Sequence, residues 1–224
     1  MQVPFPRRGN ILIKVNLYCR GSDGSARAFA ERFVSEEPGS DEKYIRKQNQ
    51  EDLFMEFKEV VRNRYSCKKY SDRPVEAEKL NAILEAGRAA PTAKNLQEQH
   101  VYVLQSAEAL AKIDAVTPCR YGAPTVLVVA FDKNNVFTYP GGRRDSGVED
   151  ATIVATHMIL AAADQGVDSC WINFLDPEKL AEGLGLPENE EVLMVMDLGY
   201  AAEGAGPLPN HSSRKPLNET VSWL

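Results

Sequence analysis

Residues 125–131, Thr-Val-Leu-Val-Val-Ala-Phe, form an apolar run that contains no charged side chain. A strand of this composition carries apolar side chains on both faces, so other elements have to cover it on both sides. Helical and strand-like patterns alternate around it. The helix predicted at 146–165 is apolar on nearly all sides, which indicates a central position in the fold. Gly166 is expected to end this helix. Helices are predicted at 56–64, 75–90, 107–116, 146–165 and 177–184, and strands at 100–104, 125–131, 169–174 and 191–198.

The chain changes character near Met55. Residues 1–54 hold 9 basic and 8 acidic residues and one strand-like run at 11–18, followed by polar sequence. One strand with few apolar partners cannot offset the conformational entropy lost on ordering. We therefore expect residues 1–54 to be a loosely structured extension, or a misassigned start with Met55 as the natural first residue. Residues 55–224 are expected to form one domain.

Charge and composition exclude several classes of protein. The 26 Lys+Arg residues against 32 Asp+Glu residues give a formal net charge of -6, which disfavours general binding to nucleic acid. No apolar run approaches the ~20 residues that span a bilayer, and no secretory signal pattern is present, so we expect a cytoplasmic protein without a membrane partner. The four cysteines lie far apart without a Cys-x-x-Cys pair, which predicts free thiols and no metal site.

The common catalytic motifs are missing from the sequence. It contains no Gly-x-Ser-x-Gly elbow, no phosphate-binding P-loop and no Gly-x-Gly-x-x-Gly after a strand. No histidine has a partner four residues away, and His157 on the apolar helix is interpreted as a packed core or interface residue. The acidic residues are scattered over helix surfaces without a context that raises a pKa. We therefore expect no catalytic side chain.

Positive charge is concentrated in residues 62–73, Arg-Asn-Arg-Tyr-Ser-Cys-Lys-Lys-Tyr-Ser-Asp-Arg. One interpretation is a solvated helix end, where cations complement the helix dipole. In the other, Arg64, Ser66 and Lys68 alternate along an extended segment and point to the same side. Two cations and a hydroxyl donor aimed together suit a phosphate monoester. A second basic pair, Arg214-Lys215, could close on the same phosphate from the C-terminal tail.

Five segments in order along residues 55–224 resemble the motifs of the nitroreductase family. They are 61–75, 86–97, 122–129, 150–172, and 198–200 together with 214–216. The first contains an Arg-x-Ser-x-Lys run, which in this family grips the phosphate and ribityl chain of FMN. The second, Ala-Gly-Arg-Ala-Ala-Pro-Thr-Ala-Lys-Asn-Leu-Gln, is similar to the family's Ala-Gly-x-x-Ala-Pro-Ser-x-x-Asn-x-Gln segment. Residues 1–54 lie outside the resemblance.

The resemblance implies three groups of FMN-binding residues. They are Arg64, Tyr65, Ser66 and Lys68 with Arg214 and Lys215 for the phosphate and ribityl oxygens; Pro91, Thr92, Asn95 and Gln97 from the partner subunit; and Trp171, Ile172 and Asn173 along the ring, with a backbone N–H near flavin N5. Some of them also have a structural interpretation, with Pro91 as a helix stop, Asn95 as a turn cap and Trp171 as a core residue.

The fold that the resemblance implies is an α+β three-layer sandwich, with a central mixed, mainly antiparallel sheet flanked by helices. Two chains would form an intertwined homodimer, with the C-terminal tail of each reaching across to the other. The implied function is two-electron transfer from NADH or NADPH through FMN to small electron-poor acceptors, such as nitroaromatics or quinones, by a ping-pong mechanism. The chemistry would take place on flavin N5.

Two departures from the family pattern leave alternatives open. The usual Gln-Pro-Trp is Gln97-Glu98-Gln99 here, so the aromatic residue of that part of the pocket is missing. The segment between Phe131 and Ser146 is short, which predicts a small, open pocket. One alternative is a different flavin reaction in the same fold, such as flavin fragmentation or reductive dehalogenation. The other is a non-enzymatic FMN-binding protein.

Overall fold

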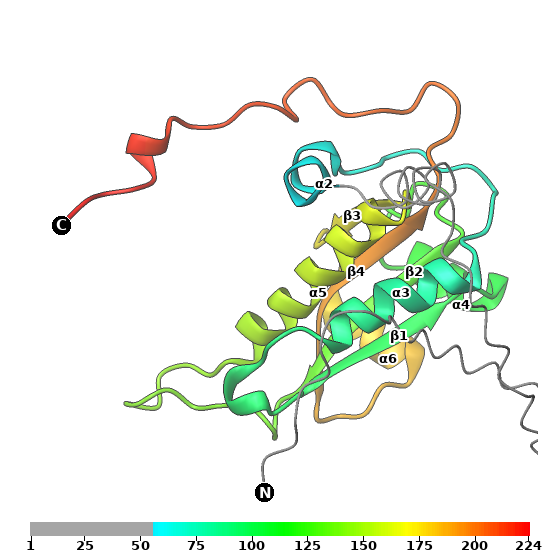
Figure 1. Ribbon diagram of the computed structural model, residues 1–224. Helices are drawn as coiled ribbons and strands as arrows, with labels where there is room; N and C mark the ends of the chain where they lie inside the picture. The colour runs from blue at the N-terminus through cyan, green and yellow to red at the C-terminus, as the bar shows by residue number, and fades with distance from the viewer. Residues whose placement is uncertain (1–55) are drawn as a thin grey trace, which may run out of the picture. The chain divides into compact units, whose positions relative to one another are not determined.

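The computed structural model describes residues 56–224 (Figure 1). The expectations for residues 1–54, a loose extension or a misassigned start, lie outside these residues. No helix in 56–224 is both long and apolar enough to cross a membrane.

Four antiparallel strands form the sheet of the described region, in the order β1-β2-β4-β3. They are β1 (Gln99–Leu104), β2 (Thr125–Asp132), β3 (Asp168–Ile172) and β4 (Glu190–Gly199). The one parallel pairing described is an isolated bridge between Ser66 and Ser169. All but the last residue of β2 are buried, which confirms the strand expected from the apolar run at 125–131.

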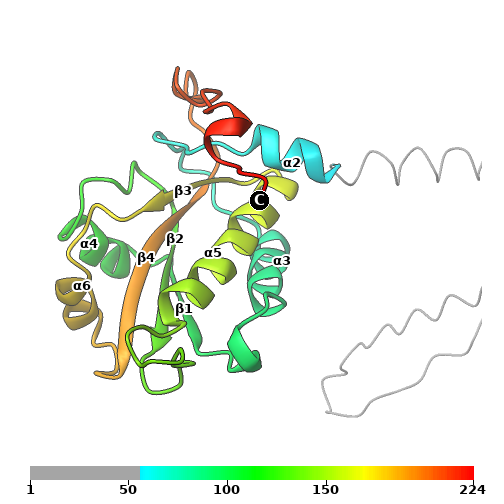
Figure 2. The same cartoon turned by 90° about the vertical axis from the view of Figure 1, so that its left-hand side faces the viewer.

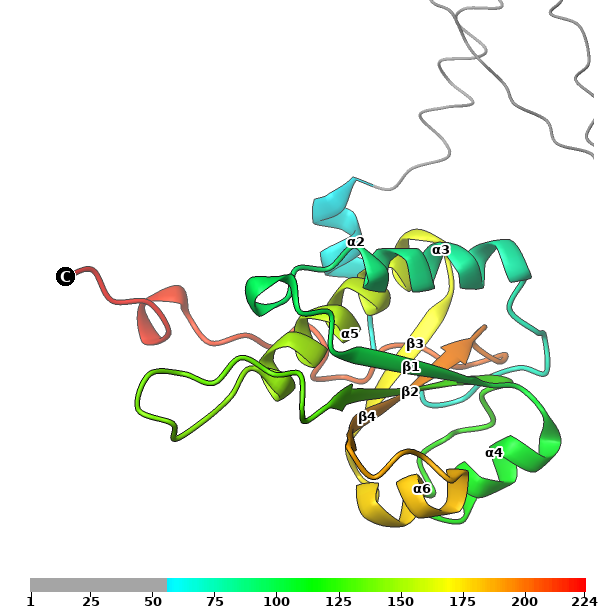
Figure 3. The same ribbon diagram turned by 90° about the horizontal axis from the view of Figure 1, so that it is seen from below.

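Helices cover both faces of the sheet, so the fold has three layers (Figures 2 and 3). On one side lie α2 (Phe57–Asn63), α3 (Ala77–Arg88) and α5 (Gly147–Asp164), and on the other lie α4 (Ala107–Asp114) and α6 (Pro177–Leu184). Two short 3-10 helices are η1 (Ala93–Asn95) and η2 (Leu217–Glu219). Alternate residues of β2 supply the two cores, with Leu127 on the α5 side and Val128 on the α4–α6 side.

Helix α5 packs one face against the sheet and against α3. Val154 and Met158 are fully buried on this face, and Gly166, with φ +63°, follows the end of the helix as expected. Among residues 56–224, the opposite face is not covered at His157, which is exposed and whose Nδ1 lies 2.8 Å from the carbonyl oxygen of Ile153. Of the two interpretations of His157, the core position is wrong, because the described elements that pack on this part of α5 lie on its other side, and the interface position stays a prediction.

Gly147 gives a test of the packing between α5 and β2. A Cβ at this position would lie 2.3 Å from Cε2 of Phe131, whose ring is buried. Gly147→Ala is therefore expected to lower the free energy of unfolding by about 1–3 kcal/mol, measured by urea denaturation. Gly183→Ala in α6 is the control, because a Cβ there meets nothing within 4 Å. It should be neutral or stabilising by up to about 1 kcal/mol; equal losses in both variants would contradict the steric argument.

Candidate functional site

The basic segment after α2 runs along the edge of the sheet. Helix α2 ends at Asn63, and Arg64 has the non-helical angles φ -57° and ψ 126°. Ser66 then pairs with Ser169 of β3, and the backbone N–H of Cys67 donates to the carbonyl oxygen of Ser169 at 3.0 Å. The side chain of Cys67 is fully buried while Ser66 is half-buried. The chain is therefore extended at these two residues, and the Cys67 side chain faces the core.

Arg64 borders a surface cavity of about 120 Å³. Residues 63–65 line one side of it, and Ala163 with residues 166–169 lines the other. In the described part of the chain, neither Arg64 nor Lys68 forms an ion pair with a carboxylate; Lys68 Nζ lies 5.8 Å from the ring centroid of Tyr121. These two cations are thus available to an anionic ligand from outside the chain.

The C-terminal tail returns to the same region (Figure 1). Nε2 of His211 lies 3.4 Å from the carbonyl oxygen of Arg62, and the His211 ring is edge-on to the ring of Tyr65 at 6.4 Å. Arg214 donates from Nη1 to the carbonyl oxygens of His211 at 2.5 Å and of Ser213 at 2.7 Å, and Lys215 is exposed. The turn before the basic pair 214–215 is therefore held beside the segment that contains Arg64.

The loop at 91–97 adopts an unusual backbone conformation. Lys94, Asn95 and Gln97 have φ values of 54°, 57° and 54°, a region that residues other than glycine seldom occupy. The Thr92 hydroxyl accepts a hydrogen bond from the backbone N–H of Gln97 at 3.0 Å. Such conformations persist where surrounding contacts hold them, and they are frequent at binding sites.

A pair of buried carboxyl groups lies beneath this loop. Both carboxylate oxygens of Asp150, in the first turn of α5, lie 3.0 Å from the backbone nitrogen of Ala93. Glu98 is 4% exposed, and its Oε1 accepts a hydrogen bond from the Ser146 hydroxyl at 3.3 Å. Burial, together with the neighbouring Asp150 carboxyl, raises the pKa of Glu98 to about 6. The residue that replaces proline in the family motif is therefore part of the support of the loop.

The strand β3 presents its residues to alternate sides. Trp171 is half-buried against the α5-side core, and its Nε1 donates to Oδ1 of Asn173 at 2.5 Å. Ile172 is buried in the opposite core, so only its backbone can serve a ligand on the α5 side. Asn173 is exposed.

The predicted site residues fall into two groups at opposite ends of α5. The loop at 91–97 is bonded to Asp150 near the start of this helix, whereas Ala163 near its end borders the cavity beside Arg64. At 1.5 Å per residue, these two positions are about 20 Å apart along the helix. A single chain therefore does not bring the two groups together.

Sequence reasoning missed a third buried acid, in addition to Glu98 and Asp150. Asp197, on β4, is completely buried, and within residues 56–224 neither of its carboxylate oxygens has a hydrogen-bond partner. Burial raises the pKa of Asp197 to about 9, although the positive charge of Arg120 opposes the increase. In the sequence, Asp197 interrupts the apolar run of the last strand, and this interruption was the signal that could have indicated a buried carboxyl group.

Comparison with known proteins identifies the family. Residues 61–117 and 118–200 match the sequence profile of the nitroreductase family, and the chain belongs to this family. A protein of Methanothermobacter thermautotrophicus, assigned as an NADH dehydrogenase/NAD(P)H nitroreductase, is 32% identical over 161 residues, covering 68% of this chain and 81% of that protein. An NADH dehydrogenase of Thermus thermophilus is 27% identical over 204 residues, covering 75% of this chain and 96% of that protein.

Solved structures agree with this assignment and confirm the predicted α+β fold of the single chain. The crystal structure of a nitroreductase family protein from Clostridium difficile 630 has a TM-score of 0.71 and 36% identity, covering 75% of this chain and 98% of that one. A nitroreductase with bound FMN from Bacteroides fragilis has a TM-score of 0.61 and 28% identity, covering 76% of this chain and 99% of that one.

Proposed function

We propose that the domain formed by residues 55–224 is an FMN-dependent oxidoreductase that transfers two electrons from NADH or NADPH to small electron-poor acceptors. The observation that carries this proposal is the extended basic segment of a nitroreductase family chain, with Arg64 beside a cavity and free of carboxylate partners within the described residues. Nitroaromatics and quinones are the acceptors we expect. A reductase supplied by these donors would work in the cytoplasm, where both are present.

The residues of the cavity edge fit the phosphate end of FMN. Arg64 and Lys68 would supply positive charge, and the Ser66 hydroxyl would supply a hydrogen-bond donor, which is the set that binds a phosphate monoester. The backbone of Tyr65 would add contacts to the ribityl chain. Arg214 and Lys215 would complete the phosphate site, because their turn is already held against the same segment. A group with this charge and size therefore suits the residues present.

The remaining contacts to FMN would come from a second copy of the chain. Two chains paired along α5 in opposite directions would place the loop 91–97 of one beside Arg64 of the other. Pro91, Thr92, Asn95 and Gln97 would then reach the flavin from the partner subunit. This arrangement accounts for the separation of the two groups within one chain, and we propose a homodimer as the active form.

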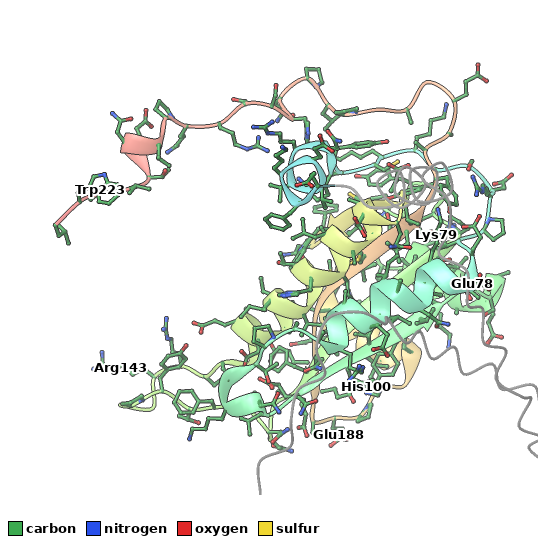
Figure 4. All side chains as sticks on the ribbon, viewed as in Figure 1. Glu78, Lys79, His100, Arg143, Glu188 and Trp223 are labelled. Atoms are coloured by element: carbon green, nitrogen blue, oxygen red, sulfur yellow. The ribbon has the colours of Figure 1, made fainter. Side chains whose placement is uncertain are left out.

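Exposed apolar residues support the dimer. Phe57 is 71% exposed and borders a groove of about 300 Å³ between α2 and α5, which Val60 and Leu160 also line. Trp223 is 93% exposed near the end of the tail (Figure 4). An exposed large apolar side chain beside an apolar groove is typical of an interface. The tail of each chain would cross to the other subunit and cover this surface.

FMN supplies the hydride and electron transfer, and the protein binds and orients the reactants. Trp171 and Asn173 would lie along the flavin ring, and the backbone of Ile172 would offer an N–H toward N5. Donor and acceptor would use the same face of the ring in turn, which gives ping-pong kinetics. No side chain of the site has to transfer a proton in this scheme.

Absorption spectroscopy and anaerobic stopped-flow mixing test the proposal. The purified protein should show a flavin spectrum, NADH or NADPH should bleach it, and a nitroaromatic or quinone should restore it. A flavin that neither donor reduces would instead indicate a binding protein without reductase activity. A colourless protein that takes up no added FMN would contradict the proposal as a whole.

A further inference from the structure

The segment between β2 and α5 forms a hairpin at residues 137–146. Thr138 forms an antiparallel bridge with Asp145. The backbone N–H of Tyr139 donates to the carbonyl oxygen of Arg144 at 3.1 Å, and the backbone N–H of Ser146 donates to the carbonyl oxygen of Phe137 at 2.9 Å. The hairpin projects beyond the start of α5, and Arg143 extends from it into solvent (Figure 4). The short loop of the sequence is therefore an ordered element with two arginines next to its turn.

This hairpin contacts the loop 91–97. Nδ2 of Asn135, just before the hairpin, donates to the carbonyl oxygen of Leu96 at 3.0 Å. The Lys94 Nζ lies 4.7 Å from the ring centroid of Phe137. Figures 1 and 3 both show the two segments side by side. They form one surface at the start of α5, where the proposed dimer has its partner-derived flavin contacts.

Two aromatic rings lie between two cations on this surface. The rings of Phe137 and Tyr139 have centroids 5.4 Å apart, and Cζ of Arg144 lies 4.2 Å from the Tyr139 ring. With Lys94 on Phe137, these four residues form a row that we call the cation–aromatic row. Cation–π contacts hold both charged groups over the rings and thus orient them before any ligand binds.

The positive charge of this surface is only partly compensated. Nη1 of Arg144 lies 3.5 Å from Oε1 of Glu149, a carboxylate that also accepts a hydrogen bond from the Tyr139 hydroxyl. Within residues 56–224, Lys94 and Arg143 have no carboxylate partner, and both are exposed. In a chain with a net charge of -6, such a group of cations makes a local site of attraction for anions.

We propose that Lys94, Arg143 and Arg144 bind the anionic group of a reactant, so that aromatic molecules carrying a carboxylate, sulfonate or phosphate are the preferred substrates. The inference rests on the proposed function, in which the loop 91–97 reaches the flavin of the partner subunit. The hairpin would then border the same flavin, and the aromatic part of the reactant would lie over the flavin with its charge against the cations. The anion can belong to the acceptor or be the 2′-phosphate of NADPH.

Steady-state kinetics on the FMN-loaded, full-length protein test this proposal. The variants are Arg143→Gln and the double variant Lys94→Asn/Arg143→Gln, because asparagine tolerates the left-handed conformation of position 94. Lys112→Gln in α4, on the other face of the sheet, is the matched control for loss of one positive charge. The acceptors are 4-nitrobenzoate and its neutral analogue 4-nitrobenzamide, and the donors are NADPH and NADH.

The double variant should raise KM for an anionic reactant by roughly tenfold and leave its neutral counterpart within about twofold, since two exposed charges each contribute a few-fold. Added salt should reduce this difference in the wild-type protein. If KM rises selectively for 4-nitrobenzoate, the acceptor is the source of the anion. If it rises selectively for NADPH, the donor is the source. Equal changes for charged and neutral reactants, no change, or the same change in Lys112→Gln would overturn the proposal.

Failure of the proposed function gives a different result. Bleaching of the flavin by NADH reports reductase function in the wild-type protein and in each variant. If no bleaching occurs, calorimetric titration with 4-nitrobenzoate and 4-nitrobenzamide still measures anion recognition on the same proteins. Preference for the benzoate that is lost in the double variant would support the anion site, whereas equal binding of both compounds would refute it.

Discussion

Replacing Arg64 with alanine is expected to weaken FMN binding by about 10-fold to 150-fold, because a hydrogen bond to a charged group contributes roughly 1.5–3 kcal/mol. Arg64 is half-buried at the edge of the 120 Å³ cavity, and no carboxylate in the described region neutralises it. Its loss would leave the phosphate with Lys68 and the tail. Most of the variant should therefore purify without flavin and without the yellow colour.

Fluorescence titration of the apoprotein with FMN measures this effect. Lys69→Ala is the matched control, because Lys69 lies in the same basic segment and its Nζ donates instead to the carbonyl oxygen of Glu203 at 3.2 Å. This control should change the FMN dissociation constant by less than about threefold. An Arg64→Ala protein that retains its flavin fully would refute the role of Arg64.

The second large effect concerns the buried acid in the core. Asp197→Asn is expected to remove a loss of stability that the wild-type protein shows as the pH rises. The folded-state pKa is raised to about 9 from an ordinary value of 3.8, so the folded protein keeps a proton that the unfolded chain releases. The contribution of this retained proton to the free energy of unfolding is complete below pH 3.8 and declines as the pH rises to about 9. The decline is about 1.4 kcal/mol per pH unit.

Urea denaturation of both proteins between pH 5 and pH 9, at roughly one-unit steps, measures the difference in the free energy of unfolding. The advantage of the Asp197→Asn variant over the wild type should grow steadily with pH. Asp72→Asn, at an exposed position, is the control and should follow the wild-type curve. A difference that does not vary with pH would mean that the Asp197 carboxyl is ionised in the folded protein.

Local sequence pattern predicts the elements of this fold well. The run at 125–131 has no polar face, and it became the buried strand β2 in the centre of the sheet. Asp176 and Pro177 begin α6, where the Asp176 carboxylate accepts from the backbone N–H of Lys179 at 3.1 Å, and Gly185 ends it with φ +69°. These features depend on residues within one helical turn, so a single sequence is enough to find them.

Pairs of residues that are distant in the sequence explain what the pattern did not predict. Glu98 obtains its raised pKa from burial beside Asp150, and Asp197 obtains its own from burial near Arg120. The exposed side of α5 around His157 also depends on elements that are distant in the sequence. An apolar helix pattern does not show how many elements of the same chain will cover it.

The sequence by itself determined which residues carry the positive charge, which strand is buried on both sides, and which family the chain resembles, because these depend on side-chain chemistry at fixed spacing. Only the tertiary structure decided where these residues lie. It holds the tail beside Arg64 and the strained loop over Asp150, with α5 between them. The length of that helix separates the two halves of the proposed flavin site, since a rigid element of this length cannot bend to join its ends.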